Sequence, residues 1–318
     1  NVSFLGSFPI AIAGKIAPNK FPKCGVPVLC TPVKTLAIKQ KYIFYNAYLT
    51  KHTFFYQFLK IALLYLRVLM KKLKEILGGL WKIYVFLWFT ILLLVLYPLY
   101  LSFLLTEKHF NKGFLLLRFH TGLLMYLSGI FISVKNKHYI KKGQAYVITP
   151  NHSSFLDIII LYQTFTQYFV FMGKKSLATV PVFNIFFKKM NIPVDRRSAR
   201  DGKRAMDRCG KELEKGHSVV MFPEGTISAK VPELLKFKNG AFKLAIEMQV
   251  PVIPITFFTN YKRLEMAGLF SGKAGPGIAK AVIHEPIPTI GMTEDDIPQL
   301  KERVFNIIND ELLAHQQR

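Results

Sequence analysis

The sequence predicts an α/β domain, with a mixed sheet flanked by helices, preceded by a pair of membrane-anchoring helices. After Lys142, short apolar runs typical of buried strands alternate with segments of helical periodicity. Before it, residues 83–105 form a run of 23 residues without a charge, and about 20 apolar residues span a bilayer. Hydrophobic residues make up 51% of the 318 residues, which also favours a membrane segment.

The first 69 residues have an unusual composition. They contain nine Lys or Arg and no Asp or Glu, whereas an ordinary stretch of this length has roughly eight acids. The first methionine is Met70, and a basic head and the long apolar run follow it. We therefore expect residues 1–69 to be upstream sequence translated with the gene. The alternative is a basic, aromatic arm that lies on the membrane surface.

Cysteine usage indicates neither a disulfide nor a metal site in the rest of the chain. Cys24 and Cys30 lie in the doubtful leader, and Cys209 lies in an amphipathic helical pattern. A lone thiol cannot form an internal disulfide, so we expect Cys209 to pack in the interior. No zinc-type spacing is present, and we expect no metal ligand.

Residues 70–138 are predicted to anchor the chain in the membrane. The second apolar run, residues 113–134, carries Arg118 and His120, so it is either a second span or an interfacial helix whose polar groups reach the headgroups. Lysines precede the first run and follow the second, which places both flanks in the cytoplasm if the two runs form a hairpin or a re-entrant pair. We therefore expect a protein of the inner (cytoplasmic) membrane whose domain, residues 139–318, faces the cytoplasm. The alternative is a buried helix pair in a soluble protein.

The domain of residues 139–318 shows strand and helix patterns in alternation, as expected for a sheet buried on both faces. Strands are expected at 145–150, 168–173, 191–195, 218–223, 250–257 and 279–287. Helices are expected at 153–165, 182–190, 203–215, 240–248 and 296–315.

A polar cluster, Asn-His-Ser-Ser, follows the first expected strand of this domain. Pro150 ends the strand, and Ser153 or Ser154 can cap the helix that follows. His152 in this loop can then meet Asp157 in the first helical turns. A carboxylate bonded to one imidazole nitrogen stabilises the imidazolium and leaves the other nitrogen free as a base. The alternative is a satisfied histidine and an acidic residue near the positive end of a helix.

Three further segments are weak indicators by themselves. F-P-E-G-T follows a hydrophobic strand, at a position where open α/β sheets bind ligands; Gly225 permits close backbone approach and Thr226 offers a hydroxyl. D-R-R ends a short strand and is a candidate anion clamp through Arg196, although such a group is more often a solvated ion pair. V-P-V-I-P-I-T-F is first of all a core strand.

The order and spacing of these segments are specific. N-H-x₄-D, a short strand ending in D-R, F-P-E-G-T and V-P-x-x-P closely resemble the four-block signature of the glycerolipid acyltransferase family, which includes 1-acyl-glycerol-3-phosphate acyltransferases. The resemblance covers roughly residues 80–290 and implies a fold like that of glycerol-3-phosphate acyltransferase. It implies that His152 removes the proton from an acceptor hydroxyl, which attacks an acyl thioester directly. Asp157 then orients His152 and stabilises its charge.

The resemblance also implies binding roles. The residues matched to binding of the acceptor's glycerol phosphate are Arg196, Glu224, Gly225 and Thr226. Pro254 matches the block associated with the acyl-donor side. Lys238 precedes a helix shortly after the third block, so it is a further candidate for holding phosphate.

Two positions depart from the family pattern. The third block usually continues with Arg where this sequence has Ile227, and a commonly glycine position in the second block is Asn184. Loss of a bidentate phosphate donor is not conservative. The acceptor is therefore either phosphorylated and held by other cations, or a different lyso-lipid that is not phosphorylated or is linked to an amino acid.

The expected partners are membrane lipids, a lyso-lipid acceptor, and acyl-CoA or acyl carrier protein as the acyl-donor substrate, with no cofactor. The net charge of +24 does not favour nucleic acid, because the basic residues are scattered and no nucleic-acid module is recognisable. A non-catalytic membrane lipid-binding protein is one rival. A thioesterase or lipase is another, although no G-x-S-x-G elbow is present.

Overall fold

The computed structural model describes residues 32–182, 184–195 and 197–317, and it divides the chain into two units, Asn1–Val68 and Leu69–Arg318. A single long helix, α1 (Pro32–Leu104), contributes to both units and contains Pro98. Of the first unit the structure describes only helix, and its large apolar side chains from Tyr42 onward are exposed. Our interpretation of residues 1–69 as translated upstream sequence stays a prediction.

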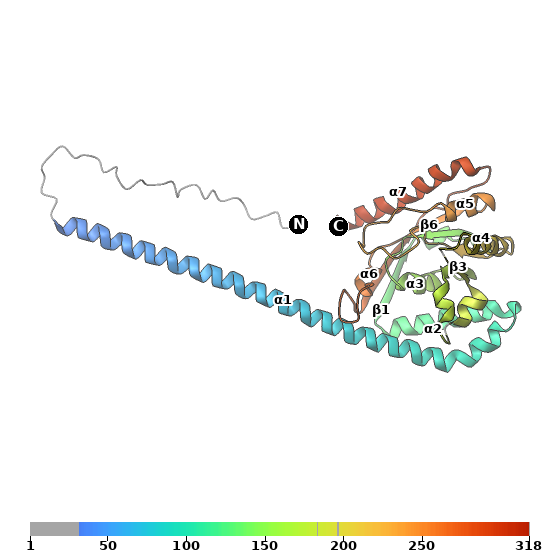
Figure 1. Cartoon of the computed structure of the whole chain (residues 1–318), viewed down its shortest axis with the longest axis horizontal. Helices are drawn as coiled ribbons and strands as arrows, with labels where there is room; N and C mark the ends of the chain where they lie inside the picture. The colour runs from blue at the N-terminus through green and yellow to red at the C-terminus, as the bar shows by residue number, and fades with distance from the viewer. Residues whose placement is uncertain (1–31, 183, 196, 318) are drawn as a thin grey trace. The chain divides into compact units, whose positions relative to one another are not determined.

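The second unit is built on a seven-stranded mixed sheet (Figure 1). The strand order is β1-β7-β6-β2-β5-β3-β4, and only the β6–β7 pair is antiparallel. The strands are β1 (Ile130–Lys135), β2 (Val147–Pro150), β3 (Phe169–Lys174), β4 (Ile192–Val194), β5 (Ser218–Val220), β6 (Val252–Phe257) and β7 (Gly277–Ile283). The central strands β2, β5 and β6 are buried at every position, as expected for parallel strands covered on both faces.

Helices cover both faces of this sheet. The remaining helices are α2 (Phe110–Leu127), α3 (Leu156–Thr164), α4 (Ala199–Glu214), α5 (Gly240–Glu247), α6 (Asn260–Arg263) and α7 (Ile297–Gln316). Helix α2 packs on α3, whereas α4 and α7 both pack on α5. In Figure 1, α2 lies below the sheet and α5 and α7 lie above it. The predicted α/β fold with a mixed sheet flanked by helices is confirmed.

The expected elements of residues 139–318 are present, with one change of type. All six expected strands form, and four of the five expected helices form with shifted ends. The pattern at 182–190 was expected to be a helix, and residues 184–190 are helical, α-helical at 184–185 and then π-helical at Phe186–Met190. Val182 at its start has a φ of 65°, so the chain leaves helical geometry there.

The second apolar run differs from our expectation. Residues 113–134 are neither a second span nor one interfacial helix, because they contain the end of α2 and then β1, which pairs in parallel with β7. His120 was expected to reach the headgroups, but it is 2% exposed and its Nδ1 lies 3.0 Å from the hydroxyl of Tyr100 on α1. Helix α2 buries one face against the domain through Phe114 and Leu117, but it exposes Leu115 and Phe119, so this run is only partly covered by protein.

The first apolar run retains the properties of a membrane segment. Among the described residues, one helix is long and apolar enough to cross a membrane, and it covers Lys39–Leu104. One face of its last turns packs on the domain through Leu93, Tyr100 and Leu104. Its other face exposes apolar side chains such as Val95.

Candidate active site

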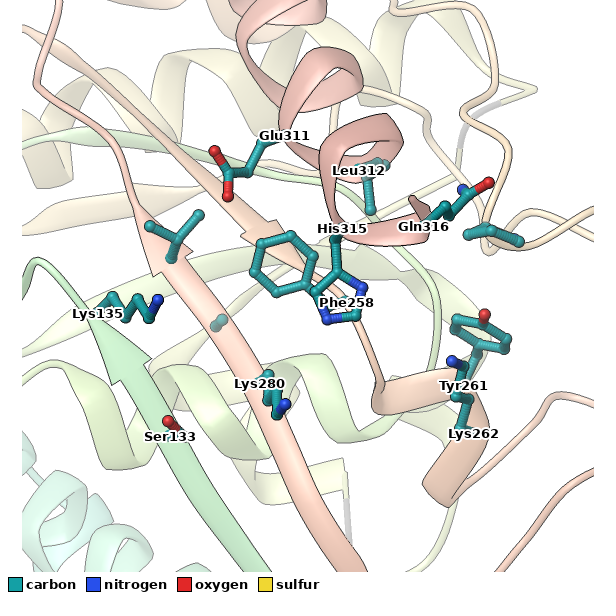
Figure 2. Close-up of a pocket in the computed structure, with 13 residues that line it drawn as sticks. Ser133, Lys135, Phe258, Tyr261, Lys262, Lys280, Glu311, Leu312, His315 and Gln316 are labelled. Atoms are coloured by element: carbon teal, nitrogen blue, oxygen red, sulfur yellow. The ribbon is translucent and has the colours of Figure 1, made fainter. Parts of the chain in front are cut away.

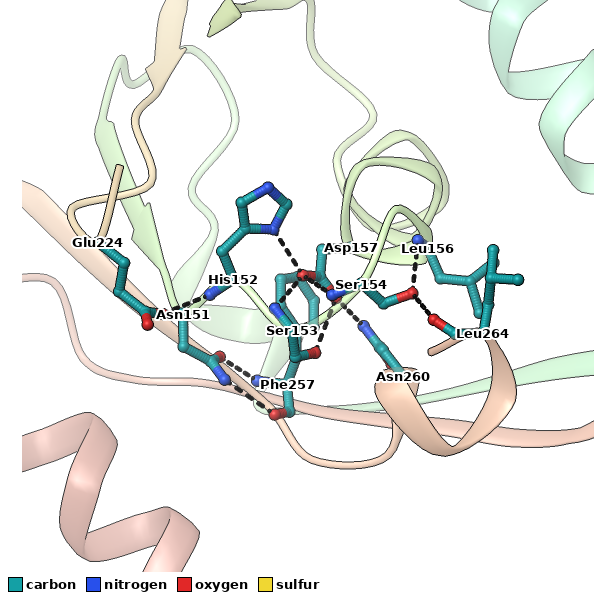
Figure 3. Close-up of polar contacts among 10 residues, drawn as sticks. All are labelled: Asn151, His152, Ser153, Ser154, Leu156, Asp157, Glu224, Phe257, Asn260 and Leu264. Carbon is teal, nitrogen blue, oxygen red and sulfur yellow. Dashed lines mark hydrogen bonds and ion pairs between the residues drawn. The ribbon is translucent and has the colours of Figure 1, made fainter. Parts of the chain in front are cut away.

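The loop after β2 brings the predicted dyad together. Pro150 ends β2, and α3 begins at Leu156, so Asp157 lies in the first helical turn. His152 lies in the intervening loop, and its Nδ1 is 2.9 Å from Oδ2 of Asp157 (Figure 3). The carboxylate is fully buried, whereas the imidazole side chain is 14% exposed. The Nε2 nitrogen is therefore the one left to act on a substrate.

Asp157 receives hydrogen bonds from several other donors. The backbone N–H groups of Ser153 and Ser154 donate to its Oδ2 over 2.6 and 2.9 Å. The Ser153 hydroxyl and the Asn260 amide donate to Oδ1 over 3.2 and 2.6 Å. This set holds the carboxylate in one orientation, which in turn fixes the plane and tautomer of the His152 ring.

Neither serine occupies the N-cap position of α3, although Ser154 binds the first N–H of the helix. The N-cap position is Phe155, which makes no side-chain cap. The Ser153 hydroxyl is used by Asp157 instead. The Ser154 hydroxyl accepts from the N–H of Leu156, at the start of the helix, and donates to the carbonyl of Leu264 over 2.6 Å. The cluster therefore supports the dyad rather than the helix end.

Glu224 lies beside the dyad but is occupied by backbone groups. It is 4% exposed; its Oε1 accepts from the N–H of His152 over 2.7 Å, and its Oε2 accepts from the N–H of Leu235 over 2.9 Å. Burial raises the pKa of this carboxyl, while the two backbone donors and His152 oppose that rise. The ring of Phe222, two residues earlier, stacks on His152 at 3.8 Å. Glu224 therefore connects the third block to the loop of residues 151–155 between β2 and α3, which we call the catalytic loop.

Gly225 and Lys238 lie against each other. Gly225 has a φ of 75°, and a Cβ built on it would lie 2.9 Å from the ammonium of Lys238. The N–H of Lys238 donates to the carbonyl of Pro223 over 2.8 Å, and α5 begins two residues later at Gly240. Thr226 follows with an exposed side chain. The structure thus groups three predicted binding residues on the loop next to His152.

The second block is only partly described, since Arg196 lies outside the described residues. On its two sides, the N–H of Asp195 donates to Oδ2 of Asp201 over 2.8 Å, and the N–H of Arg197 donates to Oδ1 of Asp195 over 3.0 Å. The hydrogen bond from the N–H of Asp195 is the main cause that lowers the pKa of Asp201. Ser198 caps α4 by accepting from the N–H of Asp201. Sequence reasoning missed Asp201, although S-x-x-D is a cap pattern that points to it.

Pro254 lies inside the sheet, one residue before Ile255, whose carbonyl accepts from the N–H of Asn151. It is buried in β6, in register with Thr149, and its carbonyl accepts from the N–H of His284. The end of the same strand is linked to the catalytic loop, because Asn151 bonds both backbone groups of Phe257 over 2.7 and 3.1 Å. Asn151 and Asn260 are two further site residues that sequence reasoning missed. Asn151 stood in the polar cluster, but nothing local marked Asn260.

One described cavity is separate from the dyad. It has a volume of about 630 Å³ between β1, β7 and the end of α7 (Figure 2). Lys135, Lys262 and Lys280 line it, but so does Glu311, and the negative end of α7 lies beside them. Since neither His152 nor Asp157 lines this cavity, its size does not make it the reaction site.

In the described part of the chain, no group of three or more His, Cys, Asp or Glu side chains is placed to hold a metal ion. Cys209 is buried in α4, as expected, and burial raises the pKa of its thiol to about 12. Such a thiol is not an activated nucleophile.

Comparison with known proteins agrees with this geometry. The Acyltransferase family model matches residues 131–258, which contain the dyad and the third and fourth blocks. The chain is 31% identical over 195 residues to an uncharacterised acyltransferase of Schizosaccharomyces pombe, covering 60% of this chain and 69% of the relative. It is 30% identical to 1-acyl-sn-glycerol-3-phosphate acyltransferase alpha of Homo sapiens, over 57% of this chain and 63% of the relative. It is 29% identical to 1-acyl-sn-glycerol-3-phosphate acyltransferase of Borreliella burgdorferi, over 63% and 78%.

A solved structure shares the fold. The crystal structure of the 1-acyl-sn-glycerophosphate acyltransferase of Thermotoga maritima superposes with a TM-score of 0.64 at 21% identity, covering 77% of this chain and 98% of that one. The chain therefore belongs to the acyltransferase family. It is an enzyme of the acyltransferase class.

Proposed function

We propose that the protein is a membrane-bound O-acyltransferase that transfers a fatty acyl group from a thioester to the hydroxyl of a lyso-lipid. The acceptor that we favour is 1-acyl-glycerol-3-phosphate, which gives phosphatidic acid. The observation that carries the proposal is the 2.9 Å contact of His152 with the buried Asp157, in a chain of the acyltransferase family. The names of the relatives from Homo sapiens and Borreliella burgdorferi support this acceptor.

The proposed reaction is a direct transfer. Nε2 of His152 takes the proton from the acceptor hydroxyl as its oxygen attacks the thioester carbon. The tetrahedral intermediate then breaks its carbon–sulfur bond, and the departing thiolate takes the proton from the imidazolium. Asp157 stabilises the imidazolium between these steps, since it is buried against Nδ1. No protein nucleophile is needed, so the two products leave without an acyl-enzyme.

The third block supports a phosphorylated acceptor. The ammonium of Lys238 lies over Gly225, and the hydroxyl of Thr226 is exposed on the same loop. A cation beside a glycine, whose backbone a ligand can approach closely, can bind a phosphate oxygen. Glu224 has both oxygens engaged by backbone N–H groups, so we assign it to the position of His152 rather than to acceptor binding.

One observation favours a second candidate acceptor. Ile227, where an arginine is usual, is partly buried beside this loop and brings no charge. A lyso-lipid that is not phosphorylated, or is linked to an amino acid, is therefore the alternative. For either acceptor we propose acyl-CoA or acyl carrier protein as the donor, no cofactor, and a site facing the cytoplasm at the inner membrane.

An acyl-transfer assay on membranes containing the full chain tests the proposal. The acceptors are a panel of lyso-lipids, and each is offered with both thioester carriers. His152→Ala should lower turnover by about 10²- to 10⁴-fold, because base catalysis contributes that much. His217→Ala is the matched control, since Nδ1 of His217 lies 2.8 Å from Glu212 in a pair outside the site. Retention of most activity by His152→Ala would overturn the mechanism, and transfer only to non-phosphorylated acceptors would overturn the favoured substrate.

A further inference from the structure

The segment between α6 and β7, L-E-M-A-G-L-F-S-G-K-A-G-P, forms a closed loop with an apolar tip. Its base is fastened by a bridge between Leu264 and Ala274 and by the N–H of Glu265, which donates to the carbonyl of Lys273 over 2.8 Å. We call residues 264–276 the tip loop. Three large apolar side chains of the tip loop are about half exposed. They are Met266, Leu269 and Phe270. Large apolar side chains gathered on one loop mark a surface that meets a partner.

The tip loop is attached to α1 at the boundary of the charge-free run. The ammonium of Lys82 donates to the carbonyls of Gly268 and Ser271 over 3.0 and 2.8 Å. The ring of Phe270 packs on the backbone of Gly79, where a Cβ would overlap it. Lys82 is the last charged residue before residues 83–105. A lysine at such a boundary marks the level of the bilayer surface, so the tip loop lies at that level too.

The other end of the tip loop is attached to the catalytic loop. The carbonyl of Leu264 accepts from the hydroxyl of Ser154 over 2.6 Å, and the N–H of Ser154 donates to Asp157. Asn260, four residues before Leu264, donates to Asp157 directly. One short segment thus connects the membrane helix to the buried carboxylate of the dyad.

The charge of the tip loop is also suitable for a lipid surface. Lys262, Arg263 and Lys273 lie at its base, against a single acid, Glu265. The ammonium groups of Lys262 and Lys273 both lie over the ring of Tyr261, 5.8 and 5.5 Å from its centroid. Cations at the base and apolar side chains at the tip are the arrangement of segments that bind the bilayer interface, with charge on the headgroups and apolar groups below them.

We propose that the tip loop is a second membrane contact, which inserts Leu269 and Phe270 into the interface of an anionic phospholipid bilayer. Lys262 and Lys273 then lie among the lipid phosphates. Through the contact between Leu264 and Ser154, the insertion holds the catalytic loop at the depth in the membrane interface where the hydroxyl of a lyso-lipid lies. The functional part of this inference rests on the proposed lyso-lipid activity, whereas the membrane contact itself does not.

The depth of a spin label tests the contact without any enzyme assay. Leu269→Cys is labelled in the full chain with Cys24 and Cys30 replaced by Ser, and Cys209 is retained because it is buried. Ile290→Cys is the matched control, since Ile290 is also an exposed apolar residue but lies in the loop before α7. In vesicles of phosphatidylcholine with phosphatidylglycerol, the label at 269 should gain contact with oxygen and lose contact with a water-soluble nickel complex. The label at 290 should stay accessible to nickel, and equal nickel access at both positions would overturn the proposal.

The functional part is tested with a double variant. Leu269→Ser with Phe270→Ser should raise KM for a long-chain lyso-lipid in vesicles about tenfold, the equivalent of ~1.4 kcal/mol. Turnover of a short-chain, monomeric acceptor should not change. An equal loss on both acceptors would show a structural role and overturn this part. If no lyso-lipid is acylated by the unaltered chain, the proposed function fails, and the label depth still decides the membrane contact.

Discussion

Replacement of Asn260 by Ala tests how the dyad is held. The amide of Asn260 is fully buried and donates to Oδ1 of Asp157 over 2.6 Å, the shorter of the two bonds to that oxygen. A hydrogen bond to a charged group contributes ~1.5–3 kcal/mol. If all of it is lost in the transition state, where Asp157 faces the imidazolium, kcat falls by about 10- to 150-fold, since 1.4 kcal/mol is tenfold. This is an upper limit, because four other donors remain on the carboxylate.

The stability of the same variant should change much less than its rate. Oδ1 of Asn260 is buried and has no hydrogen-bond partner among the described residues, so its removal relieves an unsatisfied acceptor. That gain offsets part of the lost bond.

The assay pairs steady-state kinetics over a pH series with thermal denaturation. Thr289→Val is the control, because the buried hydroxyl of Thr289 donates to the carbonyls of Ala245 and Val250 away from the dyad. This control should lose ~1–3 kcal/mol of stability and keep its kcat. A kcat for Asn260→Ala that matches the control at every pH would refute the assignment of Asn260 as a positioning residue.

Two further predictions concern residues that hold loops of the site. Glu224→Gln should lose ~1–3 kcal/mol of stability and lower kcat with little change in KM, because it displaces the backbone of His152; an effect on KM alone would instead make Glu224 an acceptor ligand. Burial raises the pKa of the Glu224 carboxyl, so protonation of Glu224 stabilises the folded state at low pH, and this stabilisation is lost as pH rises through the raised pKa. The free energy of unfolding of Glu224→Gln should not show this pH dependence. Asp201→Ala should raise KM for the acceptor by about two- to tenfold, because the second block loses the hydrogen bond from the N–H of Asp195 to Asp201. The pKa of Asp201 is lowered, so its contribution to the stability of the folded state is complete at neutral pH and is lost as pH falls through the lowered pKa. If the substitution leaves the KM for the acceptor unchanged, the second block is ordered without Asp201.

The parts of the site that were predictable are local in the sequence. His152 and Asp157 are five residues apart, and a strand end followed by a helix start is sufficient to bring them together. Gly225 was expected to permit close backbone approach, and the structure gives it a left-handed φ of 75°. Helix α5 begins at Gly240, as expected. Such features depend on neighbouring residues, whose preferences are visible in any short window.

The second apolar run shows the limit of such patterns. A run of apolar residues has the same composition whether lipid or protein covers it, and the domain covers one face of residues 113–134 and leaves side chains such as Phe119 exposed. The strand β1 within it was missed because its pairing with β7 depends on a segment more than 140 residues later. Periodicity in β1 itself is weak, with exposed and half-buried residues in alternation after Ile130.

The alternation of strands and helices, the four blocks and the His152–Asp157 dyad can be read from the amino-acid order, because each arises from short-range preferences and spacing. The groups that hold the dyad, and the direction in which it faces, depend on the folded chain. Asn260 meets Asp157 across 103 residues, and Lys82 meets the tip loop across 186. Contacts at such separations are set by the packing of the whole sheet and its helices, where each bond forms only after many others have positioned its two groups.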